Sequence, residues 1–332
     1  MKLFQQLKAA FNYGFYSEYR FSRVVRHRLM RYYSEEAPRA TNTRKMVIAM
    51  FDGRKRHGGL ADRLRGICTT YHFCREHGLD FRLHFTSPFR LEEFLEPNSY
   101  DWRIDEKEIS YNSLDARPVY IASQNYDEER DNRFQRRMAE KFFGEDYKQL
   151  HAYTNMRFEE AHFGDSFHAL FRPAAWLQRL VDEQLAILGG KGQYIAVSSR
   201  FLESLGDFNE DRDRAPKALP EEEQERLLKQ CGEALEKIHA AHPDERILVT
   251  SDSGRFLRYV ARYDYCRTLP GKIGHMDVVE DEKEVHTKTF LDFLVLGEAK
   301  RHYYLIGPGM YRGNFSRRAA QIGNAPFHEI IF

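Results

Sequence analysis

The sequence has little of what marks secreted, membrane-spanning or nucleic-acid-binding proteins. Its 332 residues include only four cysteines, none in a Cys-x-x-Cys pair, so we expect neither a disulfide framework nor a thiolate metal site. No apolar run reaches the roughly 18 residues of a membrane span, and the first residues lack the apolar core of a signal peptide. The net charge of +1 gives no reason to expect nucleic acid as a partner. We therefore expect a cytoplasmic protein with reduced thiols.

Positive charge is concentrated near the amino terminus. Residues 1–45 carry ten Lys and Arg against three Glu, a surplus of +7, with Phe4, Phe11 and Phe15 among them at helical spacing. Basic amphipathic helices of this kind lie on anionic membrane surfaces, which predicts peripheral contact with the membrane. The same aromatic residues also suit a helix packed on the protein's own core. Both interpretations stay open for this amino-terminal arm, residues 1–44.

Beyond the arm, the hydrophobic pattern predicts an α/β protein. A buried strand at 45–52, a turn, a helix and an alternating strand at 80–87 form a first unit. A second α/β series begins after a helix at 174–190 and continues to the end of the chain. The pattern predicts two Rossmann-like domains, at 45–185 and 186–332, with a cleft between them.

The first expected strand ends in a turn rich in glycine and arginine. The stretch 58–62 reads GGLAD, and Arg63 and Arg65 follow it. Ligands of open parallel sheets bind at the carboxyl ends of the strands. The paired glycines Gly58 and Gly59 let a ligand approach the backbone closely, and the arginines favour an anionic ligand.

Three further strand ends, all in the second half, carry polar clusters. The strand in QYIAVSSR runs into Arg200, and Gly206-Asp207 follows after an apparent insertion. A second strand ends in Ser251-Asp252-Ser253. A third passes through a glycine-rich loop to Asn314-Phe315-Ser316 at the start of a helix. Loops of this last type offer backbone N–H groups and a helix amino terminus to a phosphate.

In their order and spacing, these segments resemble the fucosyltransferase superfamily that includes the nodulation α1,6-, the α1,2- and the protein O-fucosyltransferases. The stretch 58–62 is similar to their GGxGN turn, with Ala61 and Asp62 in place of glycine and asparagine. The segment around Arg200 is similar to their HxR or HVRRxD segment. Ser198 stands there in place of histidine, which puts the role of that histidine in doubt.

The remaining segments extend the resemblance to about residues 45–325. The stretch 251–253 is similar to their TDD- or SDS-like strand end. Asp292 in an expected helix, followed by 314–316, is similar to their aspartate-bearing helix and S-S-F-S-like turn. The resemblance implies the GT-B arrangement, with the acceptor on the amino-terminal domain and the nucleotide sugar on the carboxyl-terminal one. It also implies transfer from GDP-fucose with inversion and without a metal.

The residues themselves suit this chemistry. A diphosphate that leaves without a metal needs a fixed cation, and Arg200 offers a bidentate fork, the alternative being a structural ion pair. A base must accept the acceptor's proton, and the available carboxylates are Asp62, Glu203 and Asp207. For Asp252 and Ser316, turn formation or helix capping competes with ligand binding. The residues expected to contact substrates are Gly58, Gly59, Arg63, Ser198, Asp252, Ser253, Asn314, Phe315 and Ser316.

Metal motifs are weak in this sequence. The stretch DRD at 211–213 matches the DxD motif of the other glycosyltransferase fold, but it lies in a charged insertion with no apolar strand before it. The 14 histidines form no His-Glu-x-x-His pair. We therefore expect no metal and no cofactor, and interpret DRD as a solvated loop.

The sequence thus predicts a fucosyltransferase that transfers fucose from GDP-fucose to a glycan or a lipid-linked oligosaccharide. Two alternatives stay open. One is the same fold with another nucleotide sugar, and the other is a carbohydrate- or nucleotide-binding module without catalysis.

Overall fold

The computed structural model describes residues 15–122, 128–208, 218–274 and 282–332, which form two compact units. The first unit comprises the chain up to His57 together with 62–87 and 97–170, and the second comprises 58–61, 88–96 and 171–332. The DRD stretch and the aromatic residues Phe4 and Phe11 lie outside the described residues.

The first unit is built on a four-stranded parallel sheet. The strand order is β2-β1-β5-β4. Its strands are β1 (Met46–Phe51), β2 (Asp80–Phe85), β4 (Ala116–Ile121) and β5 (Gln149–Thr154). Its helices are α2 (Phe15–Leu29), α3 (Leu60–Glu76), α4 (Glu128–Phe143) and α5 (Phe163–Leu170), with 3₁₀ turns at Met30–Tyr32, Glu106–Glu108 and Glu160–His162.

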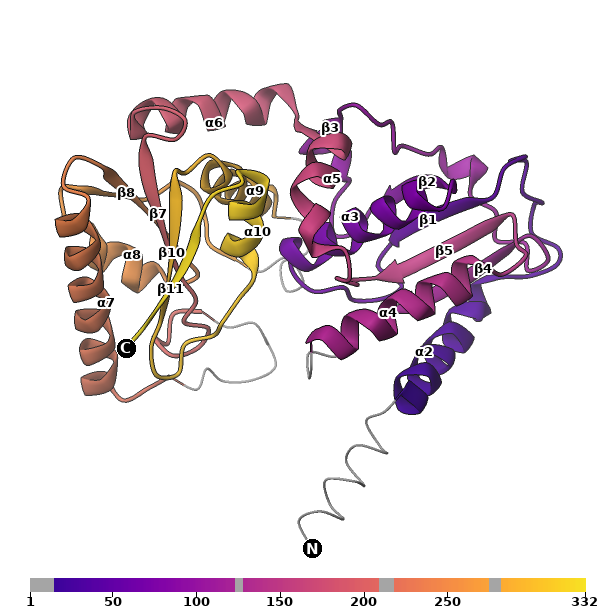
Figure 1. Cartoon of the computed structure of the whole chain (residues 1–332), viewed down its shortest axis with the longest axis horizontal. Helices are drawn as coiled ribbons and strands as arrows, with labels where there is room; N and C mark the ends of the chain where they lie inside the picture. Colours follow the sequence, from indigo (N-terminus) through magenta and orange to yellow (C-terminus); the bar gives the residue numbers. More distant parts are fainter. Residues whose placement is uncertain (1–14, 123–127, 209–217, 275–281) are drawn as a thin grey trace, which may run out of the picture. The chain divides into compact units, whose positions relative to one another are not determined.

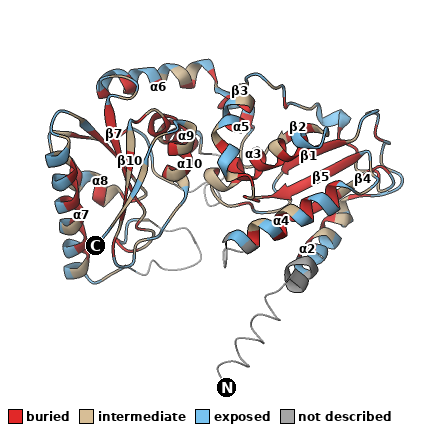
Figure 2. Cartoon of the chain, viewed as in Figure 1, coloured by how far each residue is buried: buried red, intermediate tan, exposed pale blue. Residues whose placement is uncertain are grey.

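Helices cover both faces of this sheet (Figure 1). Because successive strand residues point to opposite faces, Met46, Ile48 and Met50 of β1 pack on the side of α2. On the other side lies α3, whose Tyr71 ring contacts Phe81 of β2 with centroids 5.6 Å apart. A strand enclosed in this way is apolar throughout, and all six residues of β1 are buried (Figure 2).

The described part of the amino-terminal arm packs on the core of the first unit. Val25 and Leu29 of α2 are buried in the cluster that covers the sheet. Arg26 donates hydrogen bonds of 3.0 and 2.7 Å to the two carboxylate oxygens of Glu145. The described part of the arm therefore packs on the protein's own core with one face of α2, and membrane contact of the arm stays a prediction. None of the described helices is long and apolar enough to cross a membrane.

The second unit is built on a five-stranded parallel sheet. The strand order is β11-β10-β7-β8-β9. Its strands are β7 (Tyr194–Ser199), β8 (Arg246–Ser251), β9 (Cys266–Arg267), β10 (Arg301–Ile306) and β11 (Phe327–Ile331). Its helices are α6 (Ala175–Leu188), α7 (Glu221–Ala241), α8 (Gly254–Val260), α9 (Lys283–Gly297) and α10 (Phe315–Ile322). A short ladder joins β3 (Leu95–Pro97) to β6 (Phe171–Pro173), and a 3₁₀ turn lies at Leu91–Glu93.

Two layers of helices enclose this second sheet. Ile195 and Val197 of β7 pack in one core cluster with residues of α7 and α8. On the opposite side, the hydroxyl of Tyr194 donates to the carbonyl of Val295 in α9. Figure 1 shows α7 and α8 on one side of the sheet and α9 and α10 on the other. The carboxyl ends of β7, β8 and β10 are thereby left to carry polar residues.

The strands β5 and β11 and the place of helix α6 differ from the sequence expectations. The hydrophobic pattern does not predict β5, because half of its residues, QLHAYT, are polar. It forms a buried strand because its polar groups find partners, as when Gln149 donates to Asn42 at 2.9 Å. The terminal strand β11 is also unpredicted. The helix α6, most of which was expected in the amino-terminal domain, belongs to the second unit, whose longest segment is Phe171–Phe332; the domain boundary near residue 186 stays a prediction.

Candidate functional site

The second sheet has a topological switch point between β7 and β10. From β7 the chain passes through α7 to β8 on one side, whereas β10 pairs with β7 on the other side. In open α/β sheets, ligands bind at the carboxyl ends of the strands beside such a point. At this edge, β7 continues into Arg200 and β10 continues into the loop 307–314. We take these segments as the candidate site.

Arg200 lies against the loop that follows β10. Its carbonyl accepts a hydrogen bond of 2.8 Å from the backbone N–H of Tyr311. Its guanidinium carbon lies 5.3 Å from the centre of the Tyr311 ring. A Cβ at Gly313 would stand 3.3 Å from Cδ of Arg200, which is tighter than ordinary van der Waals contact, so a glycine suits this position. The Arg200 side chain keeps 25% of its surface exposed, which leaves part of it accessible to an anion.

Asp252 holds the turn after β7. Its two carboxylate oxygens accept the backbone N–H groups of Phe201 and Leu202 at 2.8 and 2.9 Å. Leu202 has φ +51°, an uncommon conformation that these bonds stabilise. Burial raises the pKa of Asp252, while the two N–H groups and Arg200 favour its charged form. The nearest approach to Arg200 is 4.0 Å, from Nε to Oδ2. Asp252 therefore stabilises the turn, and contact of its carboxylate with a ligand stays a prediction.

Ser253 and Asp207 together form the amino-terminal end of α8. The hydroxyl of Ser253 accepts from Phe256 N–H at 3.1 Å and donates to Asp207 Oδ2 at 3.1 Å. The same carboxylate oxygen accepts from Arg255 N–H at 2.6 Å. Both residues were expected to serve substrate or catalysis, and both have structural partners.

Ser198 lies within the sheet. Its hydroxyl and that of Thr250 in β8 are 2.9 Å apart, and the next pair, Ser199 and Ser251, is 3.2 Å apart. Ser198 is buried. The position that the fucosyltransferase motif gives to histidine is thus occupied by a small hydroxyl that bonds across the strands.

The helix α10 begins at the candidate site, and a buried hydroxyl in its first turn is unsatisfied among the described residues. Asn314 is the exposed N-cap residue, but its side chain makes no capping bond. The ring of Phe315 packs edge-on against Phe293 of α9, with centroids 5.3 Å apart. Ser316 is only 2% exposed, and its Oγ has no hydrogen-bond partner among the described residues. Buried hydroxyls normally have partners, so this one needs an explanation.

Two tyrosines at this edge were missed by the sequence reasoning. The hydroxyl of Tyr304 in β10 donates to the Tyr311 carbonyl at 2.8 Å and accepts from Gly313 N–H at 2.9 Å. Burial raises the pKa of Tyr304 to about 12, so it stays a neutral brace of the loop. Tyr311 itself is half exposed beside Arg200. An aromatic residue inside the loop sequence GPGMYRGN was the available signal.

In the first unit, the arginines after the glycine turn are held by backbone. Arg63 is buried, and its guanidinium donates to the Ser87 carbonyl at 2.8 Å and lies over the Phe85 ring. Arg65 donates to the Asn155 carbonyl at 3.0 Å and pairs with Asp62 at 3.0 Å. These contacts use some of the guanidinium N–H groups, and contact of either arginine with an anionic ligand stays a prediction.

The remaining residues of the turn are more accessible. Asp62 keeps 40% of its side chain exposed. Gly58 has φ +85°, a conformation that favours glycine, and Gly59 is half-buried beside it. Because neither glycine carries a side chain, the backbone of the turn is not covered at these two positions. Close approach of a ligand to this backbone stays a prediction.

His57, directly before the glycines, was also missed. Its ring lies 4.4 Å from that of Phe51, and its Nε2 has no hydrogen-bond partner among the described residues. Burial, followed by the charges of Arg63 and Lys55, lowers the pKa of His57 to about 3, although a hydrogen bond to Thr154 backbone opposes this. The ring is therefore neutral at physiological pH.

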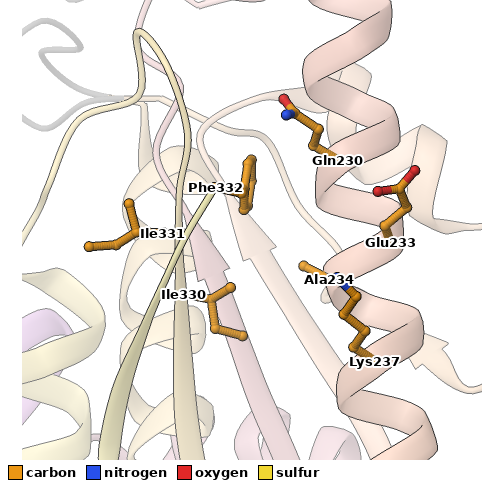
Figure 3. A pocket seen from close by; sticks show the side chains of 7 residues that line it. All are labelled: Gln230, Glu233, Ala234, Lys237, Ile330, Ile331 and Phe332. Carbon is orange, nitrogen blue, oxygen red and sulfur yellow. The ribbon is translucent and has the colours of Figure 1, made fainter.

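A small pocket of the second unit lies elsewhere. It has a volume of about 190 Å³ and opens between α7 and the end of β11 (Figure 3). No residue predicted to act in the site lines it. Its lining residues are Gln230, Glu233, Ala234, Lys237, Ile330, Ile331 and Phe332.

Comparison with known proteins identifies the fold. No protein-family model and no curated protein matches this chain. Among solved structures, NodZ α1,6-fucosyltransferase soaked with GDP-fucose matches 84% of this chain and 93% of its own, with a TM-score of 0.56 and 13% identity. A variant of Arabidopsis thaliana FUT1 in complex with GDP matches 86% and 70%, with a TM-score of 0.51 and 12% identity.

The chain shares the fold of these fucosyltransferases. Fucosyltransferase NodZ from Bradyrhizobium matches in the same way, with a TM-score of 0.54 and 13% identity over 84% of this chain and 92% of its own. The sequence resemblance and the expected α/β fold with two parallel sheets, as in GT-B fucosyltransferases, are confirmed. Identities this low establish the fold alone.

Proposed function

We propose that this chain is an inverting fucosyltransferase that transfers fucose from GDP-fucose to a hydroxyl of a glycan or a lipid-linked oligosaccharide, without a metal. The observation that carries the proposal is the switch point of the second unit, where Arg200 is partly exposed and Ser316 Oγ lacks a described partner. The fold is shared with structures that hold GDP-fucose and GDP.

The diphosphate of the donor would bind between Arg200 and the first turn of α10. The first N–H groups of a helix have no partner within the helix and attract anions. Ser316 adds a hydroxyl at that turn, and Arg200 adds a fork-shaped cation. The half-exposed ring of Tyr311 offers a surface for a base or a sugar.

Transfer is a direct displacement at the anomeric carbon. The acceptor oxygen forms a bond to C1 of fucose as the bond from C1 to the phosphate oxygen breaks, and GDP leaves with that electron pair. Arg200 and the N–H groups of α10 stabilise the charge that develops on the diphosphate. The acceptor's proton passes to a carboxylate.

Of the three carboxylates first considered as the base, Asp62, Glu203 and Asp207, we choose Asp62. Its side chain is 40% exposed, and its Oδ1 lies 3.0 Å from the guanidinium of Arg65, so the carboxylate is accessible from solvent. Asp207 already accepts hydrogen bonds from Ser253 and Arg255. We therefore propose Asp62 as the base and Asp207 as a positioning residue for α8.

Nucleotide selectivity tests the donor. In a thermal-shift comparison of GDP, UDP, CMP and ADP, a ligand of the folded state raises the melting temperature by linkage. We expect GDP alone to give a clear shift, and a selective shift with another nucleotide would assign the fold to another nucleotide sugar. Release of GDP from GDP-fucose separates an enzyme from a binding module, because a module would bind the donor and leave it intact.

We also propose that the amino-terminal arm contacts anionic membranes. On α2, Phe21 and Val24 are 48% and 42% exposed, beside the exposed Arg23 and Arg28. Each base near such a surface contributes about 1 kcal/mol. The full chain should sediment with anionic vesicles at low salt and be released as salt rises. Equal sedimentation of a variant with Arg23→Glu and Arg28→Glu would contradict this.

A further inference from the structure

Three potential metal ligands meet in the first unit, away from the residues considered so far. His72 belongs to α3, whereas Glu159 and His162 belong to the segment after β5. One ligand atom from each of the three lies within 4.8 Å of the other two. The sequence signals were spacings, His72-x₃-Glu76 on a helix and Glu159-x₂-His162, rather than a familiar motif.

The separations within this cluster suit an ion better than direct hydrogen bonds. His72 Nε2 lies 3.7 Å from Glu76 Oε1 and 3.8 Å from Glu159 Oε2. Hydrogen bonds between nitrogen and oxygen are about 2.7–3.2 Å long. Two ligand atoms that share a tetrahedral zinc ion, at about 2.0–2.1 Å each, stand about 3.3 Å apart. A small inward movement would bring these atoms to that distance.

Glu159 is fixed in the orientation that a ligand needs. Its side chain is only 7% exposed, and its second oxygen, Oε1, pairs with the guanidinium of Arg136 in α4. The same guanidinium lies 3.9 Å from Glu76 Oε2. Carboxylates that bind metals are commonly held by such outer partners. Arg136 thus holds one oxygen of Glu159 and leaves the other directed at His72.

We propose that His72, Glu159 and His162 bind a divalent transition-metal ion of the zinc class. Two imidazole nitrogens and one carboxylate oxygen form a donor set that zinc prefers, and water or Glu76 completes a tetrahedron. The ion would tie the segment after β5 to α3 and so stabilise the first unit. It has no part in the proposed sugar transfer.

Binding requires one side chain to turn. The rings of His72 and His162 are stacked, with centroids 4.0 Å apart and planes 9° from parallel. Ligand lone pairs lie in the ring plane, so two rings that share one ion cannot remain parallel at this spacing. His162 is exposed, and its ring turns at little cost.

Cobalt serves as the probe, since tetrahedral Co²⁺ absorbs visible light and zinc is silent. We expect the full chain, first stripped with a chelator, to bind one equivalent of Co²⁺ with a tetrahedral spectrum that Zn²⁺ abolishes. His162→Asn and His72→Gln should each weaken this binding by about tenfold or more, given that loss of even an outer partner costs about 10–100-fold. The matched control is His77→Asn, just beyond the end of α3, which should bind as the parent does.

Zinc should also raise the melting temperature of the parent and of the control, but not that of His162→Asn. Because His162 is exposed, this variant keeps the fold, which circular dichroism checks. Absence of the tetrahedral spectrum in the parent, or unchanged Co²⁺ affinity in His162→Asn and His72→Gln, would overturn the proposal. Neither readout involves GDP-fucose, so a failure here is distinct from a failure of the proposed activity.

Discussion

The two units each place an arginine at the carboxyl edge of a parallel sheet, and the two arginines have different surroundings. In the first unit, Arg63 is buried beneath the strand ends, donates to the Ser87 carbonyl and covers an aromatic ring. In the second unit, Arg200 retains a quarter of its side-chain surface and lies beside a half-exposed tyrosine. The first arginine tightens a loop, whereas the second is accessible to a ligand.

The same contrast separates the two serines at helix starts in the second unit. Ser253 accepts from a backbone N–H and donates to Asp207, so both of its capacities are used. Ser316 is equally buried, and its hydroxyl has no partner among the described residues. The same residue type therefore occurs both in a structural turn and in the candidate binding site. What differs is whether its polar group is accessible or lacks a hydrogen-bond partner.

The largest expected effect is on Arg200. Arg200→Ala should lower the rate of fucose transfer by about a hundredfold or more, because a fixed charge at the leaving diphosphate is lost. The control Arg262→Ala removes an exposed arginine in the turn after α8 and should leave the rate unchanged. Near-parental turnover in well-folded Arg200→Ala would end the assignment of this residue.

Replacement of Arg63 should lower the stability of the fold rather than the binding of the substrate. Arg63→Met leaves the Ser87 carbonyl without its donor, and we expect a loss of about 1–3 kcal/mol in the free energy of unfolding. Affinity for GDP should be unchanged. Arg56→Met, at an exposed position of the loop that precedes α3, is the control, and chemical denaturation measures both. A normal stability with weakened substrate binding would make Arg63 a ligand contact after all.

Ser316 and Ser253 form a smaller paired test. Ser316→Ala removes a buried hydroxyl that lacks a described partner, so stability should hold or rise while GDP affinity falls about tenfold, as for one lost bond to a charged group. Ser253→Ala should lower stability by about 1 kcal/mol, the usual value of an N-cap. Calorimetric titration with GDP measures the affinity of each variant. Equal affinities of the parent and Ser316→Ala would show that Ser316 does not contact a phosphate of GDP.

The last expected effect appears over a range of pH rather than at neutral pH, and it concerns the acid stability of the first unit. The pKa of His57 falls to about 3 in the folded chain, from an ordinary value of 6.5. The unfolded chain therefore binds the extra proton, and stability is lost as pH falls from about 6.5 towards 3, by roughly 1.4 kcal/mol per pH unit for one group. His57→Leu should flatten this slope, and the exposed His168→Asn should not. Identical slopes in parent and His57→Leu would show that the ring is not buried as described.

The sequence by itself determined those elements of the fold that depend on neighbouring residues in the chain. Apolar runs bounded by glycine and polar residues located β1, β7, β8 and β10, and helical periodicity located α6. The order of the polar strand ends was sufficient to identify the shared fold, and their position at carboxyl ends follows from the parallel topology.

Only the tertiary structure decided which polar residues use their hydrogen-bonding groups within the fold. Gln149 and His151 are polar residues of types that are usually exposed, yet both lie in the buried strand β5. They are tolerated there because Asn42 and Tyr33 supply their hydrogen bonds. The cluster of His72 with Glu159 joins segments far apart in the chain. Burial and hydrogen-bond partners are properties of segments that meet only after folding, so no local pattern in the sequence could have separated Arg63 from Arg200.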